Sequence, residues 1–507
     1  MKNLILLLSL MAYLNIYAQD PDDALRTSWF TQNGTARNMA IGGAMGSLGG
    51  DLSAAHINPA GIGLFKTREF VVSPTFNFGN NKMAYRGSDS SARHNSFQSG
   101  PIGFIFGGVP KIPGSWTSFA FSISYNQVAN YNNHIQYSGF NNYSSFTEKY
   151  LEELTRDGAD TTAAANNYIF GSSLAYNTYL IDTISIGGQM GYKSMVPISS
   201  GVIQSNDIVS TGGFNEIAFC FAGNRGDHLF LGASLTIPFI NYQRVTTYTE
   251  KDATNNPNNN FSYFTYNETY SSSGLGVGLK LGMIAKPADA WRIGFAVHTP
   301  QFIAFNDQIR SSITANTEAY AGLRTVSSDD LNKGNPGTSN YNLLTPYRVI
   351  GSLSYVLGEE EDTKNQKGFL TGDIEFVNYK GARYSAQDKT DNGLVTYYNT
   401  VNDAIKSYNK GNINVKIGGE LKFDPVMVRL GLAHYGSPYA QSVLKAGRTV
   451  LSGGLGYRQH GIFIDLSYAY TIIQDVQFPY RLNNLANTFA MIKGGKSNIS
   501  LTFGVKF

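Results

Sequence analysis

The sequence is poor in cysteine and in charge. It has one cysteine, Cys220, in 507 residues, and only 15% of its residues are charged. A single cysteine excludes an intramolecular disulfide, so we expect a buried free thiol in a strand and a fold held together without cross-links. The net charge of +3 is too small to favour nucleic acid as a partner.

Long apolar runs are also scarce. The one clear run, residues 4–16, follows Lys2 and leads to Ala18, which predicts a secretory signal over residues 1–18 that is cleaved after Ala18. Behind it no stretch of about 18 apolar residues occurs, which excludes helical membrane spans. If the mature chain enters a membrane, it must cross with strands.

Aromatic residues and glycine, by contrast, are abundant. The chain contains 32 Tyr, 31 Phe and 54 Gly, and 13% of its residues are aromatic. A membrane barrel uses amphipathic rings in girdles at both membrane edges, and glycine relieves crowding in tilted strands. This composition favours a transmembrane β-barrel.

Apolar and polar residues alternate in many segments. Residues 413–423 and 426–433 both alternate at period two and are separated by Asp424 and Pro425. A strand shows this pattern when one face meets lipid and the other a polar lumen, so the two segments predict a hairpin. The other segments of this kind are 70–78, 102–106, 119–125, 168–176, 184–192, 217–221, 229–237, 275–283, 293–297, 349–357, 370–376, 451–457, 462–470 and 499–507.

These segments predict an all-β fold: a transmembrane antiparallel β-barrel of 14 to 16 strands over residues 67–507. Short links alternate with long ones, as expected for periplasmic turns and extracellular loops, and an even strand number places both termini in the periplasm. The short links are 178–183, 223–227, 286–290, 424–425 and 458–460. The long links are 128–166, 239–272, 300–345, 378–411 and 472–496.

Two long links contain helical patches, at residues 146–154 and 401–408, where apolar residues recur at helical spacing. Such helices can serve as lids. Alternatively, they only allow long loops to pack on one another.

The segment 19–66 does not alternate and is dense in small residues, above all between Ala40 and Gly50. We predict an N-terminal hatch that packs inside the lumen, because Gly and Ala allow close backbone approach. Asp51 or Ser53 is expected to cap a short helix that Pro59 ends. A phosphate-binding loop is excluded, since no strand precedes the glycines and no Gly-Lys-Ser/Thr follows them.

The same segment carries a motif. Asp51-Leu-Ser-Ala leads to Asn58-Pro59-Ala60-Gly61 shortly after the signal. Together with residues 429–438, residues 454–470 and a terminal aromatic, this motif resembles the FadL/TodX outer-membrane transport family. The resemblance implies passive, gated diffusion of hydrophobic molecules such as long-chain fatty acids or hydrocarbons across the bacterial outer membrane.

The resemblance further implies a monomer of fourteen strands, a ligand-catching groove among the outer loops, and a lateral opening in the barrel wall. Asn58, Pro59, Ala60 and Gly61 carry over as the hatch or gate, a stiff turn in which the Asn58 side chain bonds local backbone. The family's ligand-lining residues match nothing in the loops of this chain. The implied partners are outer-membrane lipid, a hydrophobic small-molecule ligand and the barrel assembly machinery, for which the final Phe507 is the expected signal.

Catalytic and metal-binding patterns are missing. The seven histidines are scattered, and neither Gly-x-Ser-x-Gly nor His-Glu-x-x-His occurs, so we expect no enzyme activity, no metal and no cofactor. The proximity of His434 to Ser437 is interpreted as a turn contact. The acidic run 359–362 predicts a solvated turn rather than a calcium site, because consecutive carboxylates on a short link rarely converge.

Three functions remain open. The first is the conduit for hydrophobic molecules. The second is a FadL-like barrel that acts in secretion or surface assembly by docking a protein or lipopolysaccharide. The third is a general polar porin, against which the hatch argues, because an open water channel needs no plug.

Overall fold

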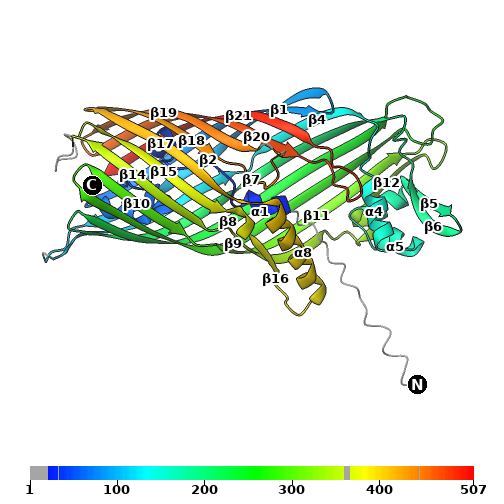
Figure 1. Cartoon of the computed structure of the whole chain (residues 1–507), viewed down its shortest axis with the longest axis horizontal. Coiled ribbons are helices and arrows are strands. Elements are labelled where there is room, and N and C mark those ends of the chain that lie inside the picture. The colour runs from blue at the N-terminus through cyan, green and yellow to red at the C-terminus, as the bar shows by residue number, and fades with distance from the viewer. Residues whose placement is uncertain (1–20, 32, 113, 359–365, 443, 445) are drawn as a thin grey trace, which may run out of the picture.

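The chain forms a closed antiparallel β-barrel around a helical N-terminal segment (Figure 1). The computed structural model describes residues 21–507 except 32, 113, 359–365, 443 and 445. The predicted signal 1–18 and the acidic run 359–362 lie outside these residues. The predicted all-β barrel with an internal plug is confirmed, and its fourteen strands fall at the lower end of the predicted range.

Ten strands of the barrel are continuous. They are β1 (Arg68–Tyr85), β2 (Ser88–Gly108), β7 (Val202–Arg225), β8 (Leu229–Asp252), β9 (Tyr263–Ala288), β17 (Gly411–Phe423), β18 (Val426–Tyr435), β19 (Gly447–Gln459), β20 (Ile462–Gln477) and β21 (Ala490–Lys506). Each strand pairs with its neighbour, and β21 pairs with β1 to close the wall.

Four further wall strands are interrupted, each forming two consecutive elements. They are β3 (Trp116–Asn130) with β4 (Asn133–Asn141), β10 (Trp291–His298) with β11 (Phe302–Asn316), β13 (Gly337–Leu344) with β14 (Arg348–Leu357), and β15 (Gly368–Asn378) with β16 (Arg383–Ala386). Both elements of each interrupted strand pair with a neighbouring wall strand: β3 and β4 with β7, β10 with β14, β11 with β13, and β13 with β16. The interruptions therefore do not open the barrel on these sides.

Strands β17 and β18 show why the barrel suits a membrane. Ile413 and Ile417 are 53% and 56% exposed on the outer face, whereas Lys416 and Glu420 are 1% and 3% exposed in the lumen. The two strands pair around the turn at residues 424–425, as predicted. An apolar outer face and a polar inner face match a barrel surrounded by hydrocarbon.

Strands β7, β8 and β9 rise beyond the apolar belt. On β9 the outer face is apolar from Met283 to Leu275 and then polar at Ser273, Thr269 and Asn267, while pairing with β8 continues. The predicted long loop 239–272 is therefore wrong over most of its length. Its polar residues face water on an extended ladder, and the alternation that marks a lipid-facing strand is absent there.

Two predicted strands at the long-loop end are also wrong. Within residues 168–176 the chain turns into helix α6 (Ser172–Asn177), and residues 184–192 belong to a separate hairpin, β5 (Ile181–Ile186) with β6 (Gln189–Ser194). Both predicted helical patches are confirmed, in α4 (Glu148–Arg156) and in α8 (Asn392–Tyr408). No helix of the described residues is long and apolar enough to cross a membrane.

These outer elements form a compact lobe with its own core. Phe146 lies at its centre, stacked on Tyr248 with ring centroids 4.7 Å apart and close to Tyr266 at 5.2 Å. The buried Glu250 carboxylate accepts hydrogen bonds from the Phe146 backbone at 2.8 Å and from the Ser145 hydroxyl at 2.6 Å. The loops therefore fold against the extended strands, which explains why short apolar segments there resembled strands.

Replacing Arg429 with Leu is expected to lower the free energy of unfolding by about 3–5 kcal/mol. The buried guanidinium of Arg429 lies 2.6 Å from Glu420 and 2.6 Å from Asp465, and its loss leaves buried carboxylates without this cation. Urea unfolding of the reconstituted barrel measures the change. The control is Arg310→Leu, which breaks an exposed pair and is expected to cost less than about 1 kcal/mol. Equal losses in both variants would contradict the prediction.

Candidate functional site

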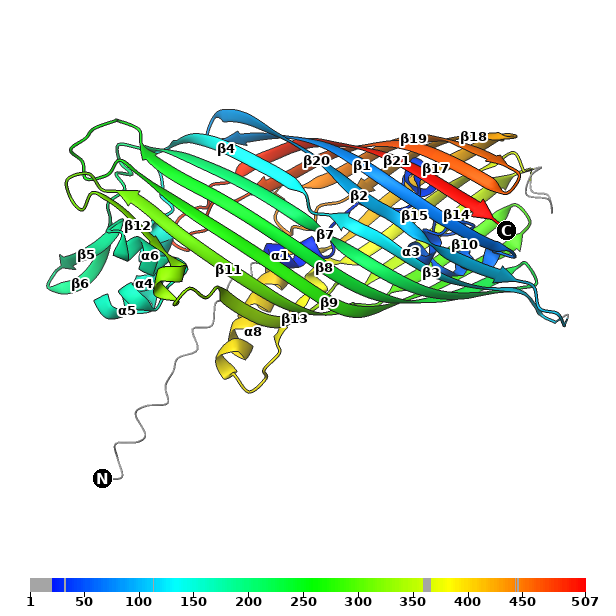
Figure 2. The ribbon, with the colours of Figure 1, turned by 180° about the vertical axis from the view of Figure 1, so that it is seen from behind.

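The N-terminal segment, here called the hatch, runs through the lumen from residue 21 to residue 66 (Figure 2). Its elements are α1 (Pro21–Arg26), α2 (Ala36–Ala40), α3 (Ala54–Ile57) and the 3-10 helix η1 (Pro59–Leu64). Helix α1 lies near the middle of the barrel, and the later elements lie toward the end that carries the short turns and the C-terminus. Nearly all hatch side chains are buried, as the prediction of a lumenal plug requires.

The predicted gate residues form one turn between α3 and η1. The side-chain oxygen Oδ1 of Asn58 accepts a hydrogen bond from the Ala60 backbone N–H at 3.2 Å and so caps η1. Its amide donates to the Gly46 carbonyl at 2.5 Å and to the Met283 carbonyl on β9 at 3.1 Å. Asn58 thus joins two parts of the hatch and the wall, which goes beyond the local bond that was predicted.

The wall makes room for this turn with two glycines. A Cβ atom on Gly232 of β8 would lie 2.4 Å from the Pro59 carbonyl carbon, and one on Gly282 of β9 would lie 1.9 Å from Asn58 Oδ1. Any larger residue at these positions would displace the turn. The hatch turn therefore fits against the wall because these two wall residues are glycines.

The cap expected for α3 differs in detail. Ser53 occupies the N-cap position but makes no capping bond, because its hydroxyl accepts from the Thr35 backbone at 2.8 Å. Asp51 Oδ1 accepts from the Ser53 backbone at 2.8 Å, and its other oxygen accepts from the Thr35 hydroxyl at 2.7 Å. These two side chains tie two segments of the hatch together instead of capping a helix.

Charged lumen residues hold the hatch to the wall. His56 Nδ1 donates to Glu216 at 2.8 Å, its Nε2 accepts from Ser124 at 3.0 Å, and Glu216 also pairs with Lys280. Burial lowers the pKa of His56, although Glu216 opposes this effect, so the imidazole fits a neutral donor and acceptor. Arg37 of α2 lies 3.5 Å from Glu420. Thus two hatch residues, His56 as a hydrogen-bond donor and Arg37 as a cation, each contact a carboxylate of the wall.

Little free space remains where the hatch meets these charges. A cavity of about 50 Å³ lies between hatch and wall, room for one or two waters, and it is lined by His56, Glu216, Lys280 and His298 among others. His298 donates to the Ile57 carbonyl at 2.7 Å. The hatch and the wall therefore pack closely at this level.

Above this level, toward the long-loop end, the lumen is aromatic. We call this region the vestibule; it consists of Tyr131, Phe214, Tyr242, Phe305, Tyr341 and Tyr384. Helix α1 packs into it: Ala24 belongs to the same apolar cluster, and the Arg26 guanidinium lies 4.1 Å from the Tyr242 ring centre. The amphipathic helix α8 covers one side with Tyr398, Val401 and Ile405.

The wall beside the vestibule has an incomplete ladder. Strands β2 and β3 pair from Gly108 with Phe119 up to Ile102 with Tyr125, and among the described residues no ladder pair joins β2 to β3 or β4 beyond that point. Side chains bridge the gap instead: Gln98 donates to the Gln127 carbonyl at 3.0 Å. We call this stretch, between residues 88–101 of β2 and residues 126–141 of β3 and β4, the seam.

Sequence features mark where the seam starts. Pro101 has no backbone donor, and the β1–β2 register shifts between Val72 and Pro74 at the same level. On the other side, the register of β3 with β7 shifts between Gln127 and Ala129. Outside, Phe97 is 55% exposed, whereas the next outward residues of β2, Asn95 and Arg93, are polar, so the seam starts at the edge of the apolar belt.

The hatch and the vestibule both contact residues of the seam. Asn33 of the hatch donates to the Gln127 carbonyl at 2.8 Å, directly behind the side-chain bridge. Tyr131, where β3 breaks, donates through its hydroxyl to the Arg26 carbonyl at 3.0 Å and belongs to the vestibule. The aromatic part of the lumen is therefore separated from the lipid face by side chains rather than by a backbone ladder.

The remaining predicted residues lie elsewhere. Phe507 is exposed at the closing strand pair, where its backbone exchanges hydrogen bonds with Arg68 at 3.1 and 3.2 Å. His434 contacts Thr449 on the outer face at 3.0 Å rather than Ser437. Cys220 is a buried free thiol in β7, as predicted. Among the residues that the structure covers, no group of three or more potential ligands is placed to hold a metal ion.

Known structures share this architecture. A FadL homologue from Pseudomonas aeruginosa is similar over 94% of this chain and 98% of its own, with 12% identity and a TM-score of 0.55. The toluene transporter TodX from Pseudomonas putida is similar over 94% and 99%, with 11% identity and a TM-score of 0.51. No family model and no curated protein matches the sequence. The FadL-type fold implied by the hatch motif is confirmed, and its apolar belt fits a barrel that spans a membrane.

Enlarging Gly282 is expected to displace the hatch turn. In Gly282→Leu the new side chain overlaps Asn58, so backbone amides of residues 54–64 should exchange with deuterium at least tenfold faster. Hydrogen exchange with mass spectrometry measures this. The control Gly351→Leu adds the same side chain where nothing lies within 4 Å of the added Cβ. Unchanged protection in the Gly282 variant would show that the turn does not depend on the close fit.

Proposed function

We propose that this chain is a passive outer-membrane conduit for hydrophobic molecules, with the hatch as its gate. One observation carries the proposal: the aromatic vestibule reaches the seam through Tyr131 and Gln127, and there, among the described residues, the hatch and side chains close the wall instead of a ladder. An aromatic lining suits apolar ligands, which gain little from a polar lumen. The proposed route leads from the outer loops through the vestibule to the lipid face.

The gate acts through the start of the hatch. Helix α1 fills the vestibule, and the Arg26–Tyr242 contact and the Tyr131 bond hold it there. A ligand that enters the vestibule competes with α1 for the aromatic rings, and it shifts the equilibrium by its greater affinity for the open state. Asn33, which contacts Gln127, follows α1 along the chain, so movement of α1 also loosens the seam.

The seam is the proposed lateral exit. Backbone groups of a membrane strand normally bond a neighbouring strand, because no water is available to them in hydrocarbon. At the seam, amides of Gln98, Gln127 and Asn130 take that part, with Asn130 donating to the Phe97 carbonyl at 3.1 Å. Side-chain bridges rotate away at lower cost than a ladder separates. An apolar molecule can then leave directly into the membrane.

Asn58 and Ala60 variants test the gate. Uptake of a labelled long-chain fatty acid and of a labelled monoaromatic hydrocarbon is compared in cells with and without the protein. Asn58→Phe and Ala60→Phe should change protein-dependent uptake at least several-fold, because each overfills the turn that anchors the hatch, and with it α1, to the wall, while the barrel stays folded and heat-modifiable on gels. Wild-type uptake in both variants would remove the gate assignment, and no uptake by the wild-type barrel would favour the docking role in secretion or surface assembly.

A cross-link at the seam tests the exit. Ser96→Cys with Asn130→Cys places two thiols where the side chains now lie 3.1 Å apart, and Cys220 is buried and does not compete. Treatment with a short thiol-to-thiol cross-linker should abolish most protein-dependent uptake, and cleavage of a reducible linker should restore it. The matched control places the same pair at Thr314 and Thr325, whose hydroxyls are 2.9 Å apart on the outer lobe. Full uptake through the cross-linked seam would exclude it as the exit.

A further inference from the structure

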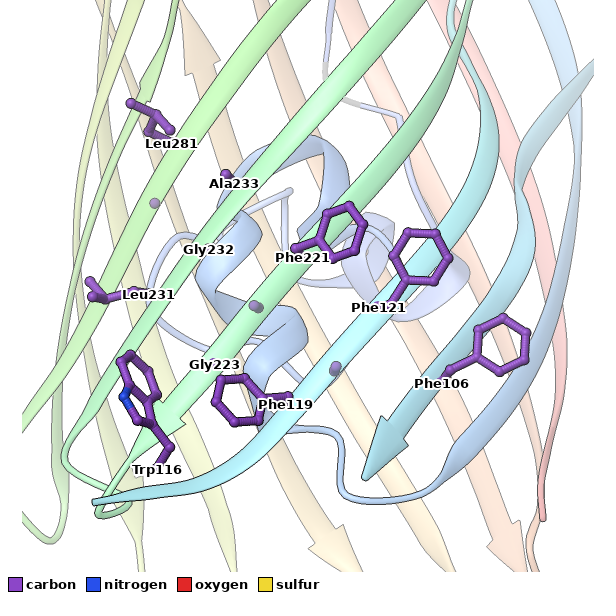
Figure 3. Close-up of a pocket in the computed structure, with 13 residues that line it drawn as sticks. Phe106, Trp116, Phe119, Phe121, Phe221, Gly223, Leu231, Gly232, Ala233 and Leu281 are labelled. Carbon is purple, nitrogen blue, oxygen red and sulfur yellow. The ribbon is translucent and has the colours of Figure 1, made fainter. Parts of the chain in front are cut away.

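The outer wall has an aromatic hollow near its short-turn end. It measures about 660 Å³, and its rim consists of side chains from β2, β3, β7, β8 and β9 (Figure 3). The rim residues are Phe106, Trp116, Phe119, Phe121, Phe221, Leu231 and Leu281. All residues that line it are apolar or glycine.

The hollow exists because two outward positions are small. Ala233 follows the outward Leu231 on β8, and Gly223 follows the outward Phe221 on β7. At Gly223 the rings of Trp116 and Phe119 lie over the backbone, since an added Cβ atom would lie 2.7 Å from Trp116 and 3.2 Å from Phe119, so the open part of the hollow lies at Ala233. The volume falls within the range of about 300–1,000 Å³ typical of small-molecule sites.

The position of the hollow along the strands indicates its depth in the membrane. Trp116 starts β3 beside a short turn, and tryptophan concentrates at the membrane–water interface. The rest of the rim extends from there into the apolar belt. The hollow therefore opens to the leaflet on the short-turn side, where the occupant is surrounded by acyl chains rather than by water.

A positive charge stands at the interfacial end. Arg225 pairs with Trp116 in the β3–β7 ladder, lies on the same outer face as Phe221 and is exposed. The nearby Asp227 carboxylate is engaged by Asn224 at 2.6 Å and by Lys66 at 3.4 Å. An arginine at the interface beside an apolar hollow matches a phosphate joined to a hydrocarbon chain.

We infer that this hollow is a binding site for one phospholipid of the periplasmic leaflet, with an acyl chain against Ala233 and the Trp116 and Phe119 rings and the phosphate at Arg225. The inference does not depend on transport. It gives the barrel a retained lipid on the wall that faces the hatch turn, since Gly232 and Gly282 contact Asn58 and Pro59 from inside.

Native mass spectrometry of the barrel in mild detergent with dioleoyl phosphatidylglycerol tests the site. The wild-type barrel should retain one lipid. Ala233→Phe fills the hollow and should reduce occupancy at least tenfold, whereas Ala304→Phe, the same change at an exposed position of the belt on β11, should leave it unchanged. Arg225→Gln should lower phosphatidylglycerol occupancy to that of uncharged dioleoylglycerol. Equal retention by wild type and Ala233→Phe would overturn the inference, as would dimers that Ala233→Phe abolishes.

Fluorescence gives a second readout that does not rely on filling the hollow. With Trp29 and Trp291 replaced by Phe, brominated phosphatidylglycerol in vesicles should quench Trp116 saturably and at a low mole fraction, and unbrominated lipid should compete. A variant that keeps only Trp291, which is 43% exposed on the same belt, should be quenched in proportion to bulk lipid. Identical quenching curves for the two tryptophans would overturn the inference.

Discussion

The closed hydrogen-bonded ladder is the constraint on which the rest of the structure depends. In hydrocarbon every backbone group needs a partner within the protein, so fourteen strands must pair around a full circle. Where that ladder lapses at the edge of the belt, between β2 and β3, amide side chains replace it, and Gln98 and Gln127 form the bridge. An interruption of this kind has a cost that a purely structural barrel avoids, and it lies beside the hatch and the aromatic vestibule.

Fourteen strands enclose a lumen wide enough to hold the hatch, and the hatch fills it by complementarity of two kinds. Close contact comes from missing side chains, as at Gly232 and Gly282 against the Asn58 turn. Polar contact comes from wall carboxylates such as Glu216 and Glu420, which meet His56 and Arg37. Buried charges of this sort stay in place only while paired, so the hatch and the lumen charges stabilise one another.

The outer surface changes from apolar to polar along the length of the strands. Apolar residues face outward over the length that a bilayer requires, and the same strands then continue with serine, threonine and asparagine outward into water. The outer lobe packs on this extension through Phe146 and Tyr248. Within the belt, the small residue Ala233 lies among the large aromatic side chains of β3 and β7, which gives one part of the lipid-facing wall a specific shape.

The sequence alone determined the fold class and the hairpin around residues 424–425, because a two-sided barrel strand imposes alternation that is visible locally. It also indicated the hatch, through small residues without alternation, and the buried free thiol of Cys220. It misplaced residues 168–176 and 239–272, since polar ladders and loop helices carry no lipid-facing signature. Only the tertiary structure decided that Asn58 bonds β9, that β2 and β3 part at the seam, and where the outer hollow lies. These features arise from strands far apart in sequence, and their register is fixed by closure of the whole barrel rather than by any one segment.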